Sequence, residues 1–128
     1  MTNTGYFINL SNHHHLKWNN VQLNAAREYG EIVSIEFPQV IPEADESYVR
    51  ELVDRYMGII ETYGFDNVNA VMIQGEFTFT CAMVRLLKKV GICVLSACSE
   101  RNVIEKVMDD GSVNKVAIFR FVRFREYF

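Results

Sequence analysis

The sequence lacks the features that mark a secreted or a membrane protein. It has two prolines and only three cysteines. An odd number of cysteines without a framework spacing is typical of reduced, intracellular thiols. No apolar run approaches the length of a membrane span, and residues 1–10 lack the basic and apolar regions of a signal peptide. We therefore expect a cytoplasmic protein that does not enter a membrane.

The chain also lacks an excess of positive charge. Its formal net charge is −3 at pH 7, whereas a protein that coats duplex nucleic acid needs many Lys and Arg side chains on one face. A small anionic ligand is still compatible with this charge, because backbone amides and one or two arginines can hold a phosphate. Neither a G-x-G-x-x-G motif nor a P-loop is present, which argues against a Rossmann dinucleotide site and against a P-loop ATP site.

What the sequence does contain is a regular alternation of strand and helix patterns. The composition, with 49% hydrophobic and 23% charged residues, is that of a globular chain, and the length predicts a single domain over residues 1–128. Strands are expected at residues 6–10, 31–37, 70–73 and 92–95. Helices are expected at residues 19–29 and 46–63, and a third should follow residues 74–76 and end at residue 90. Residues 103–108 and 113–124 flank the turn sequence Asp109-Asp110-Gly111 and predict a hairpin. The expected fold class is α/β, with a Rossmann-like, mostly parallel sheet, helices on both faces and a C-terminal antiparallel hairpin.

Polar residues follow three of the expected parallel strands, where open α/β sheets bind their ligands. The three segments are Ser11-Asn12-His13, Gln74-Gly75-Glu76-Phe77-Thr78 and Ser96-Ala97-Cys98-Ser99-Glu100-Arg101. In the second segment, Gly75 would let the backbone approach a ligand, and the amides that follow would open a helix with the positive end of its dipole outward. The alternative is that Thr78 only caps this helix while Glu76 occupies its favourable first turn.

The run His13-His14-His15 raises the question of a metal site. Adjacent side chains point in different directions, and no Cys or carboxylate cluster with ligand spacing supports them, so we expect neither a metal nor a cofactor. His13, nearest the strand end, is the candidate for an acid/base or ligand contact, since histidine titrates near neutrality. The alternative is three solvated loop histidines. Trp18 is expected to staple the first helix to the sheet, with a stacking platform for a base as the alternative.

Further candidates lie beyond the third and fourth strands. Glu76 and Glu100 could form a carboxylate pair for acid/base work, although the sequence does not fix their separation. Ser96 and Ser99 lack a nucleophile-elbow motif, so we expect them to hydrogen-bond a ligand or to cap a helix. Arg101 could meet a phosphate or could pair with a neighbouring carboxylate on the surface.

Three segments resemble a known family. They are Phe7-Ile8-Asn9-Leu10-Ser11-Asn12-His13, Gln74-Gly75-Glu76-Phe77-Thr78 and Phe121-Val122-Arg123-Phe124-Arg125-Glu126-Tyr127. Together they resemble small CRISPR-associated proteins of type III systems, which have a CARF-like (CRISPR-associated Rossmann fold) domain. The resemblance covers most of the chain and implies binding of a cyclic oligoadenylate, with cyclic tetra-adenylate as the first candidate. It also implies a homodimer whose two-fold axis passes through the ring.

The resemblance implies roles for the residues at the strand ends. The ligand contacts would come from Ser11, Asn12, Gln74, Gly75, Phe77, Thr78, Ser96, Ser99 and Arg101. Some relatives are metal-independent ring nucleases, in which a ribose 2′-hydroxyl attacks the adjacent phosphate, and His13 and Glu76 would then be the acid/base candidates. Other relatives only sequester the ring, and the sequence does not decide between the two.

Two alternatives stay open at this point. One is a generic nucleotide-binding regulatory module. The other is a non-catalytic dimeric interaction protein that uses its aromatic C-terminal strand, because that strand carries apolar residues on both faces, more than one buried face requires.

Overall fold

The structure is a computed structural model that describes residues 4–128 and contains one five-stranded sheet. The strands are β1 (Tyr6–Ser11), β2 (Glu31–Glu36), β3 (Val68–Ile73), β4 (Cys93–Val107) and β5 (Val113–Glu126). Their order is β2-β1-β3-β4-β5; the first four are parallel and β5 runs antiparallel to β4. The expected α/β class with a mostly parallel sheet and a C-terminal antiparallel pair is therefore confirmed.

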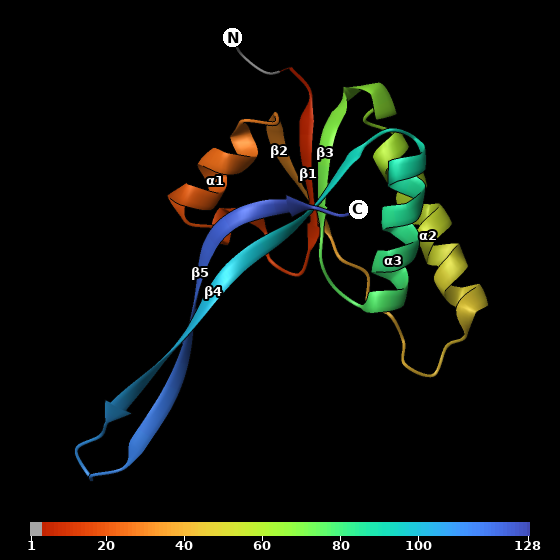
Figure 1. Cartoon of the computed structure of the whole chain (residues 1–128). Coiled ribbons are helices and arrows are strands. Elements are labelled where there is room, and N and C mark those ends of the chain that lie inside the picture. The colour runs from red at the N-terminus through yellow and green to blue at the C-terminus, as the bar shows by residue number, and fades with distance from the viewer. Residues whose placement is uncertain (1–3) are drawn as a thin grey trace.

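Three helices cover the two faces of the sheet. Helix α1 (Asn20–Arg27) lies on one face, and α2 (Glu46–Glu61) and α3 (Phe77–Lys89) lie together on the other, as Figure 1 shows. The first two helices begin where capping side chains are available. The Asn19 carboxamide accepts the N–H of Gln22 at 3.0 Å, and Asp45 accepts the N–H of Ser47 at 3.1 Å. Short 3₁₀ turns, His15–Lys17 and Phe65–Asn67, precede α1 and β3.

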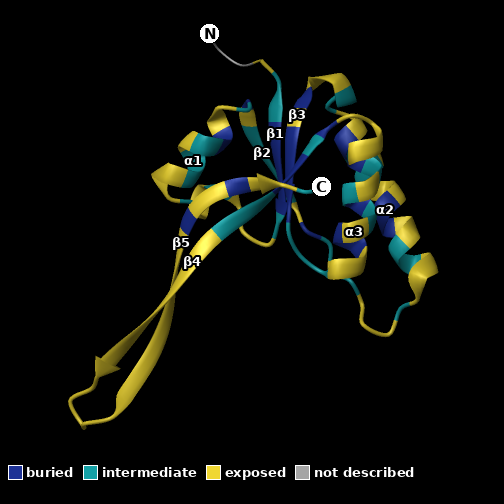
Figure 2. Ribbon diagram, in the orientation of Figure 1, coloured by how far each residue is buried: buried dark blue, intermediate teal, exposed yellow. Residues whose placement is uncertain are grey.

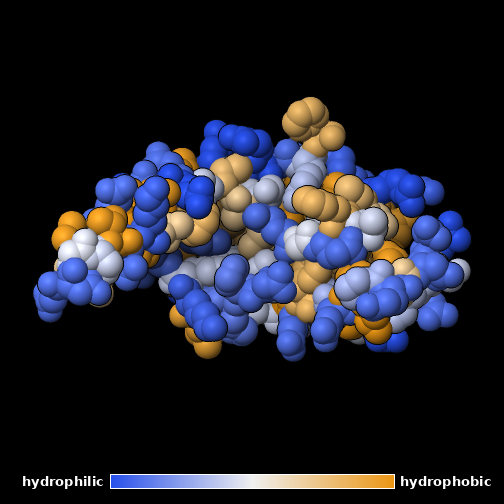
Figure 3. All heavy atoms as spheres, turned by 90° about the horizontal axis from the view of Figure 1, so that it is seen from below, coloured by the Kyte–Doolittle hydropathy of each residue, from blue (hydrophilic) through white to orange (hydrophobic). Residues whose placement is uncertain are grey.

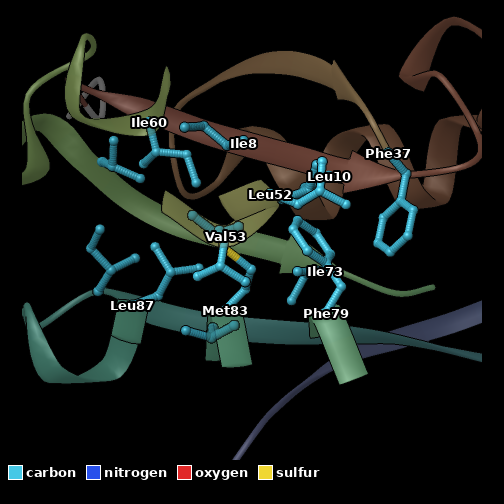
Figure 4. Close-up of a cluster of buried hydrophobic side chains, with 14 residues drawn as sticks. Ile8, Leu10, Phe37, Leu52, Val53, Ile60, Ile73, Phe79, Met83 and Leu87 are labelled. Carbon is cyan, nitrogen blue, oxygen red and sulfur yellow. The ribbon is translucent and has the colours of Figure 1, made fainter. Parts of the chain in front are cut away.

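The core has one layer on each side of the sheet, because successive side chains of a strand point to opposite faces. Ile8, Leu10 and Ile73 point toward α2 and α3, where they meet side chains such as Leu52, Met83 and Phe79 (Figure 4). Phe7, Ala70, Met72, Leu95, Phe121 and Phe124 form the second layer with Ala26 of α1. Polar residues can therefore line the same cavity only when they lie on the same side of the sheet, either the α1 side or the α3 side.

The fourth strand is much longer than expected. We expected it to end at Leu95, with a separate hairpin strand from residue 103, whereas the two form one continuous strand, Cys93–Val107. Its parallel pairing with β3 does end at Leu95, opposite Met72. However, β5 then pairs with β4 from Leu95 as far as Val107, with one register shift between Cys98 and Ser99. β5 therefore supplies backbone hydrogen-bond partners along one edge of this segment, which continues as a strand.

Beyond the sheet, β4 and β5 continue as a two-stranded ribbon. We call residues 99–121 the hairpin arm. Figures 1 and 2 show that the arm projects away from the helices and that it is exposed over most of its length. Within residues 4–128, none of the helices has the length and apolar character needed to cross a membrane.

Candidate functional site

A cavity lies where the order of the strands reverses. From β1 the chain passes to β2 on one side, and the next crossover brings β3 to the other side. Such a switch point is where open α/β sheets bind ligands. The cavity has a volume of about 880 Å³ and is lined by Ser11, Asn12, His13, Lys17, Trp18, Asn19, Gln22, Met72, Gln74, Gly75, Ala97, Ser99, Phe119 and Phe121. Of the predicted site residues, the structure thus brings together Ser11, Asn12, His13, Gln74, Gly75 and Ser99.

The cavity opens on the α1 side of the sheet, and strand alternation explains which residues reach it. Met72 belongs to the α1-side core layer, and Ala97 packs against that layer. Ser96 follows Leu95 and precedes Ala97, so its side chain points to the opposite side of the sheet. There it lies beside Tyr127, whose pKa is raised by burial and lowered in part by a hydrogen bond with Ser96. Ser96 therefore lies outside the cavity.

Asn9 fixes the loop that carries His13. This asparagine is only 1% exposed, although its neighbours in β1 are apolar. Its Nδ2 donates to the backbone oxygen of His13 at 2.8 Å and to the hydroxyl of Ser34 at 3.0 Å, and its Oδ1 accepts the Ser11 hydroxyl at 2.7 Å. We did not single out Asn9 from the sequence, although a lone amide within an apolar strand is a usable signal, because buried polar groups need partners.

The other two histidines are held away from the cavity. Nδ1 of His15 lies 2.6 Å from the hydroxyl of Ser34, and the His14 and His15 rings stack with centroids 4.5 Å apart. Burial lowers the pKa of His15, and the nearby charges of His14 and Arg27 lower it further. Within the described residues, no three His, Cys, Asp or Glu side chains come together as a metal site would require.

Gln74 and Gly75 connect the ends of β3 and β4. Oε1 of Gln74 accepts the backbone N–H of Ala97, which extends the pairing of the two strands by a side chain. This contact orients the carboxamide and leaves Nε2 as a donor next to the cavity. Gly75 makes room for Phe37, since a Cβ at this position would lie 2.2 Å from Cζ of that ring. Its lack of a side chain therefore serves the packing of Phe37, and a substitution here would disturb the core.

Three predicted residues lie at the start of α3 and do not line the cavity. Glu76 is the N-cap of this helix, and its carboxylate accepts both the N–H and the hydroxyl of Thr78, the latter at 2.6 Å. Phe77 is 84% exposed. This segment therefore caps the helix, as the alternative expected, but the capping residue is Glu76 rather than Thr78.

The hairpin arm supplies one wall of the cavity. Ser99 pairs with Phe121 and Arg101 pairs with Phe119, so all four side chains lie on the same face of the ribbon. Arg101 does not itself line the cavity, although its partner Phe119 does. Glu100 pairs with Arg120 on the opposite face, and neither Glu76 nor Glu100 lines the cavity.

Residues before α1 supply the opposite wall. Trp18 packs against Phe7 and Phe124, with ring centroids 6.2 Å and 6.4 Å apart. The expected staple between the first helix and the sheet is confirmed, and the same indole also lines the cavity. Among the described residues of the lining, Lys17 is the only lysine or arginine. We did not anticipate Lys17, because it lies in a short turn rather than at a strand end.

The arrangement suits a ligand that has both anionic and planar parts. The strand ends offer a hydroxyl, two carboxamides and an imidazole, Lys17 offers a fixed positive charge, and three aromatic rings provide flat apolar surface. Figure 3 views the molecule from the carboxyl ends of the parallel strands, where hydrophilic and apolar side chains are mixed over the centre and a group of apolar side chains lies near the end of the arm.

Comparison with known proteins gives a family without an assigned activity. The family model described as the uncharacterized protein MJ1673 family matches residues 5–125. The chain therefore belongs to that family. No curated protein and no solved structure matches the chain significantly.

Proposed function

We propose that this member of the MJ1673 family binds a cyclic oligoadenylate in the cytoplasm, with cyclic tetra-adenylate as the first candidate, through a CARF-like Rossmann domain. One observation carries the proposal: the switch-point cavity combines polar strand-end groups, a lysine and three aromatic rings. The resemblance of the segments around Ser11, Gln74 and Phe121 to small type III CRISPR-associated proteins supplies the ligand class.

Each part of the ligand has a partner in this cavity. Lys17 suits the phosphates, because its ammonium group can donate to the oxygens of a phosphodiester. Trp18 and Phe119 offer surfaces on which adenine rings stack. Nε2 of Gln74 and the Asn12 carboxamide can hydrogen-bond the edges of a base.

A homodimer fits the symmetry of the proposed ligand. Cyclic tetra-adenylate has two-fold symmetry, and two copies of one chain related by a two-fold axis would each bind half of the ring. One cavity then has to accommodate two nucleotides. A volume of about 880 Å³ is in the upper part of the range of small-molecule sites.

Ring cleavage is the second part of the proposal. The 2′-oxygen attacks the adjacent phosphorus, the P–O5′ bond breaks, and the products are a 2′,3′-cyclic phosphate and a 5′-hydroxyl. A base must take the 2′-hydroxyl proton, and the departing O5′ must receive one. His13 is our candidate for this proton transfer, because its side chain lines the cavity and its backbone is held by Asn9 and Ser11. Lys17 would stabilise the negative charge that develops on the phosphoryl oxygens.

A thermal-shift panel tests the proposed ligand. The protein is heated with cyclic tri-, tetra- and hexa-adenylate, with linear tetra-adenylate and with ATP. We expect the largest rise in melting temperature with cyclic tetra-adenylate, and a smaller rise with the linear form, which must first be ordered. An equal rise with linear adenylates or ATP would instead favour a generic nucleotide module.

A separate assay shows whether the bound ring is cleaved. Protein in excess over labelled cyclic tetra-adenylate is incubated for hours and the products are resolved by chromatography. A linear product with a 2′,3′-cyclic phosphate identifies a ring nuclease. An intact ring that is nevertheless bound identifies a protein that sequesters the messenger.

A further inference from the structure

The hairpin arm exposes more apolar surface than an isolated ribbon can stabilise. A two-stranded hairpin without a packed face is at best marginally stable in water. Yet Val107 is 76% exposed, Phe119 67%, Val103 52% and Val113 51%. Exposed apolar residues that are contiguous, rather than scattered, mark an interaction surface.

These four side chains lie on one face of the arm. In the register of β4 and β5, Arg101 pairs with Phe119, Val103 with Ala117, and Val107 with Val113. Alternate pairs share a face, so this face continues from Ser99 and Phe121, which line the cavity. We call it the cavity-side face of the arm. Ile104, Val116 and Ile118 lie on the opposite face and are less exposed, at 44–48%.

Charge is distributed unevenly along the arm and its base. On the cavity-side face, Arg101 lies at the inner end, and the paired Glu105 and Lys115 lie toward the outer end. Asp109 and Asp110 occupy the turn at the tip. Glu100, Arg120, Arg123 and Arg125 lie on the opposite face. The segments 102–104 and 116–118 contain no charged residue. The cavity-side face is therefore acidic at the tip, apolar in the middle and basic at Arg101.

We propose that the arm packs, cavity-side face to cavity-side face, against the arm of a second copy of this chain in an antiparallel arrangement. A two-fold axis across the apolar middle would bring the acidic tip of each arm toward the basic base of the other. It would also place the apolar pair Val107 and Val113 of one copy over Phe119 of its partner. The surface is self-complementary only in this antiparallel sense, which favours a second copy over an unrelated protein.

The arrangement would also complete the site. Phe119 and Phe121 form a wall of the cavity, and the partner's arm would cover the exposed side of that wall. This extends the homodimer of the proposed function, but the argument from the arm does not use the ligand. A dimer that binds no cyclic oligoadenylate would leave this inference standing and would refute only the proposed ligand.

Sedimentation equilibrium of the full chain without ligand is the first test. We expect twice the chain mass of 14.8 kDa at micromolar concentration. The variant Val107→Ser/Val113→Ser should be monomeric at the same concentration. The control Val21→Ser/Val90→Ser changes two valines that are 60% and 44% exposed, one in α1 and one at the C-cap of α3, and it should stay dimeric. A monomeric wild type, or a tip variant that dimerises like the wild type, would overturn the proposal.

Charge reversal tests the antiparallel arrangement. Asp109→Lys should raise the dimer dissociation constant severalfold, because like charges then meet at both ends of the paired arms. Asp110 is left unchanged, because its Oδ1 accepts the N–H and the hydroxyl of Ser112 in the turn. Adding Arg101→Glu should restore dimerisation in this variant, whereas Arg101→Glu alone should weaken it. Failure of the combined variant to recover would overturn the antiparallel pairing. Circular dichroism checks that all variants fold, as expected for exposed positions outside the two core layers.

Discussion

At the scale of single residues, one buried amide organises the candidate site. Asn9 is buried between apolar neighbours in β1, and its two polar atoms bond to His13, Ser11 and Ser34. A buried polar group costs free energy unless its partners are present, so this network specifies the position of the loop rather than adding much stability. The loop in turn places the His13 side chain at the cavity.

Replacing Asn9 should therefore destabilise the fold. Asn9→Ala leaves the Ser34 hydroxyl and the His13 carbonyl without this partner, and we expect the free energy of unfolding to fall by about 1–3 kcal/mol. Urea unfolding measures this change. Asn12→Ala, at an exposed position nearby, is the control and should change stability by less than about 0.5 kcal/mol. Equal effects of the two substitutions would show that the Asn9 network has no structural role.

His13 is the residue whose replacement separates catalysis from binding. If the ring is cleaved, His13→Ala should slow cleavage by on the order of a hundredfold or more while calorimetric affinity is largely retained. His14→Ala is the matched control, because His14 accepts the Leu16 N–H and does not line the cavity. A single-turnover assay compares the three proteins. Cleavage by His13→Ala at the wild-type rate would remove this histidine from the mechanism.

His15 predicts a dependence of stability on pH. Its folded-state pKa lies below the ordinary value of 6.5, mainly because burial disfavours the charged ring. A depressed pKa contributes stability that is present above pH of about 6.5 and is lost as the pH falls through the folded-state pKa. The wild type should therefore have a lower urea midpoint at pH 5 than at pH 7.5, and His15→Asn should show a smaller difference. His13→Asn serves as the control, and a similar reduction in that variant would contradict the assignment to His15.

At the scale of elements, the sequence locates most helices and strands but not the length of β4. The apolar run Ile92–Leu95 is followed by serines, a cysteine and charged residues, which is a pattern typical of a loop at a strand end. The deciding factor is long-range, since β5 supplies hydrogen-bond partners for these residues from a segment some 25 positions later. The register shift at Cys98 and Ser99 is also a property of the pair of strands, and it directs Phe121 to the cavity side.

The start of α3 gives a prediction that distinguishes a structural from a catalytic Glu76. As an N-cap, Glu76 should contribute about 0.5–2 kcal/mol to stability, and Glu76→Ala should lose that amount. Glu76→Asp should retain most of it, because aspartate is also a good N-cap. Thermal unfolding provides the readout. A variant Glu76→Ala that keeps full stability but loses ring cleavage would restore the acid/base role that the sequence suggested.

At the scale of the whole molecule, sequence reasoning locates the edge of the sheet at which the cavity lies, but not the side of the sheet on which the cavity opens. Strand ends indicate Ser11 and Gln74, and both line the cavity. The side is fixed by the packing of α1, Trp18 and the arm against the sheet, which no local pattern reveals. For that reason the site residues predicted from the sequence include Glu76 and Thr78, which lie on the α3 side. They omit Lys17 and Phe119, which line the cavity on the α1 side.

The central claim is that two chains hold one ring in cavities at the switch points of their sheets. Isothermal titration calorimetry with cyclic tetra-adenylate, on the wild type at a concentration where its mass has been measured, tests this claim most directly. We predict heat of binding with a stoichiometry of one ring per two chains, and a loss of affinity in Lys17→Ala, which removes the lysine from the cavity lining. No heat with any cyclic oligoadenylate, or unchanged affinity in Lys17→Ala with one ring per chain, would contradict the account.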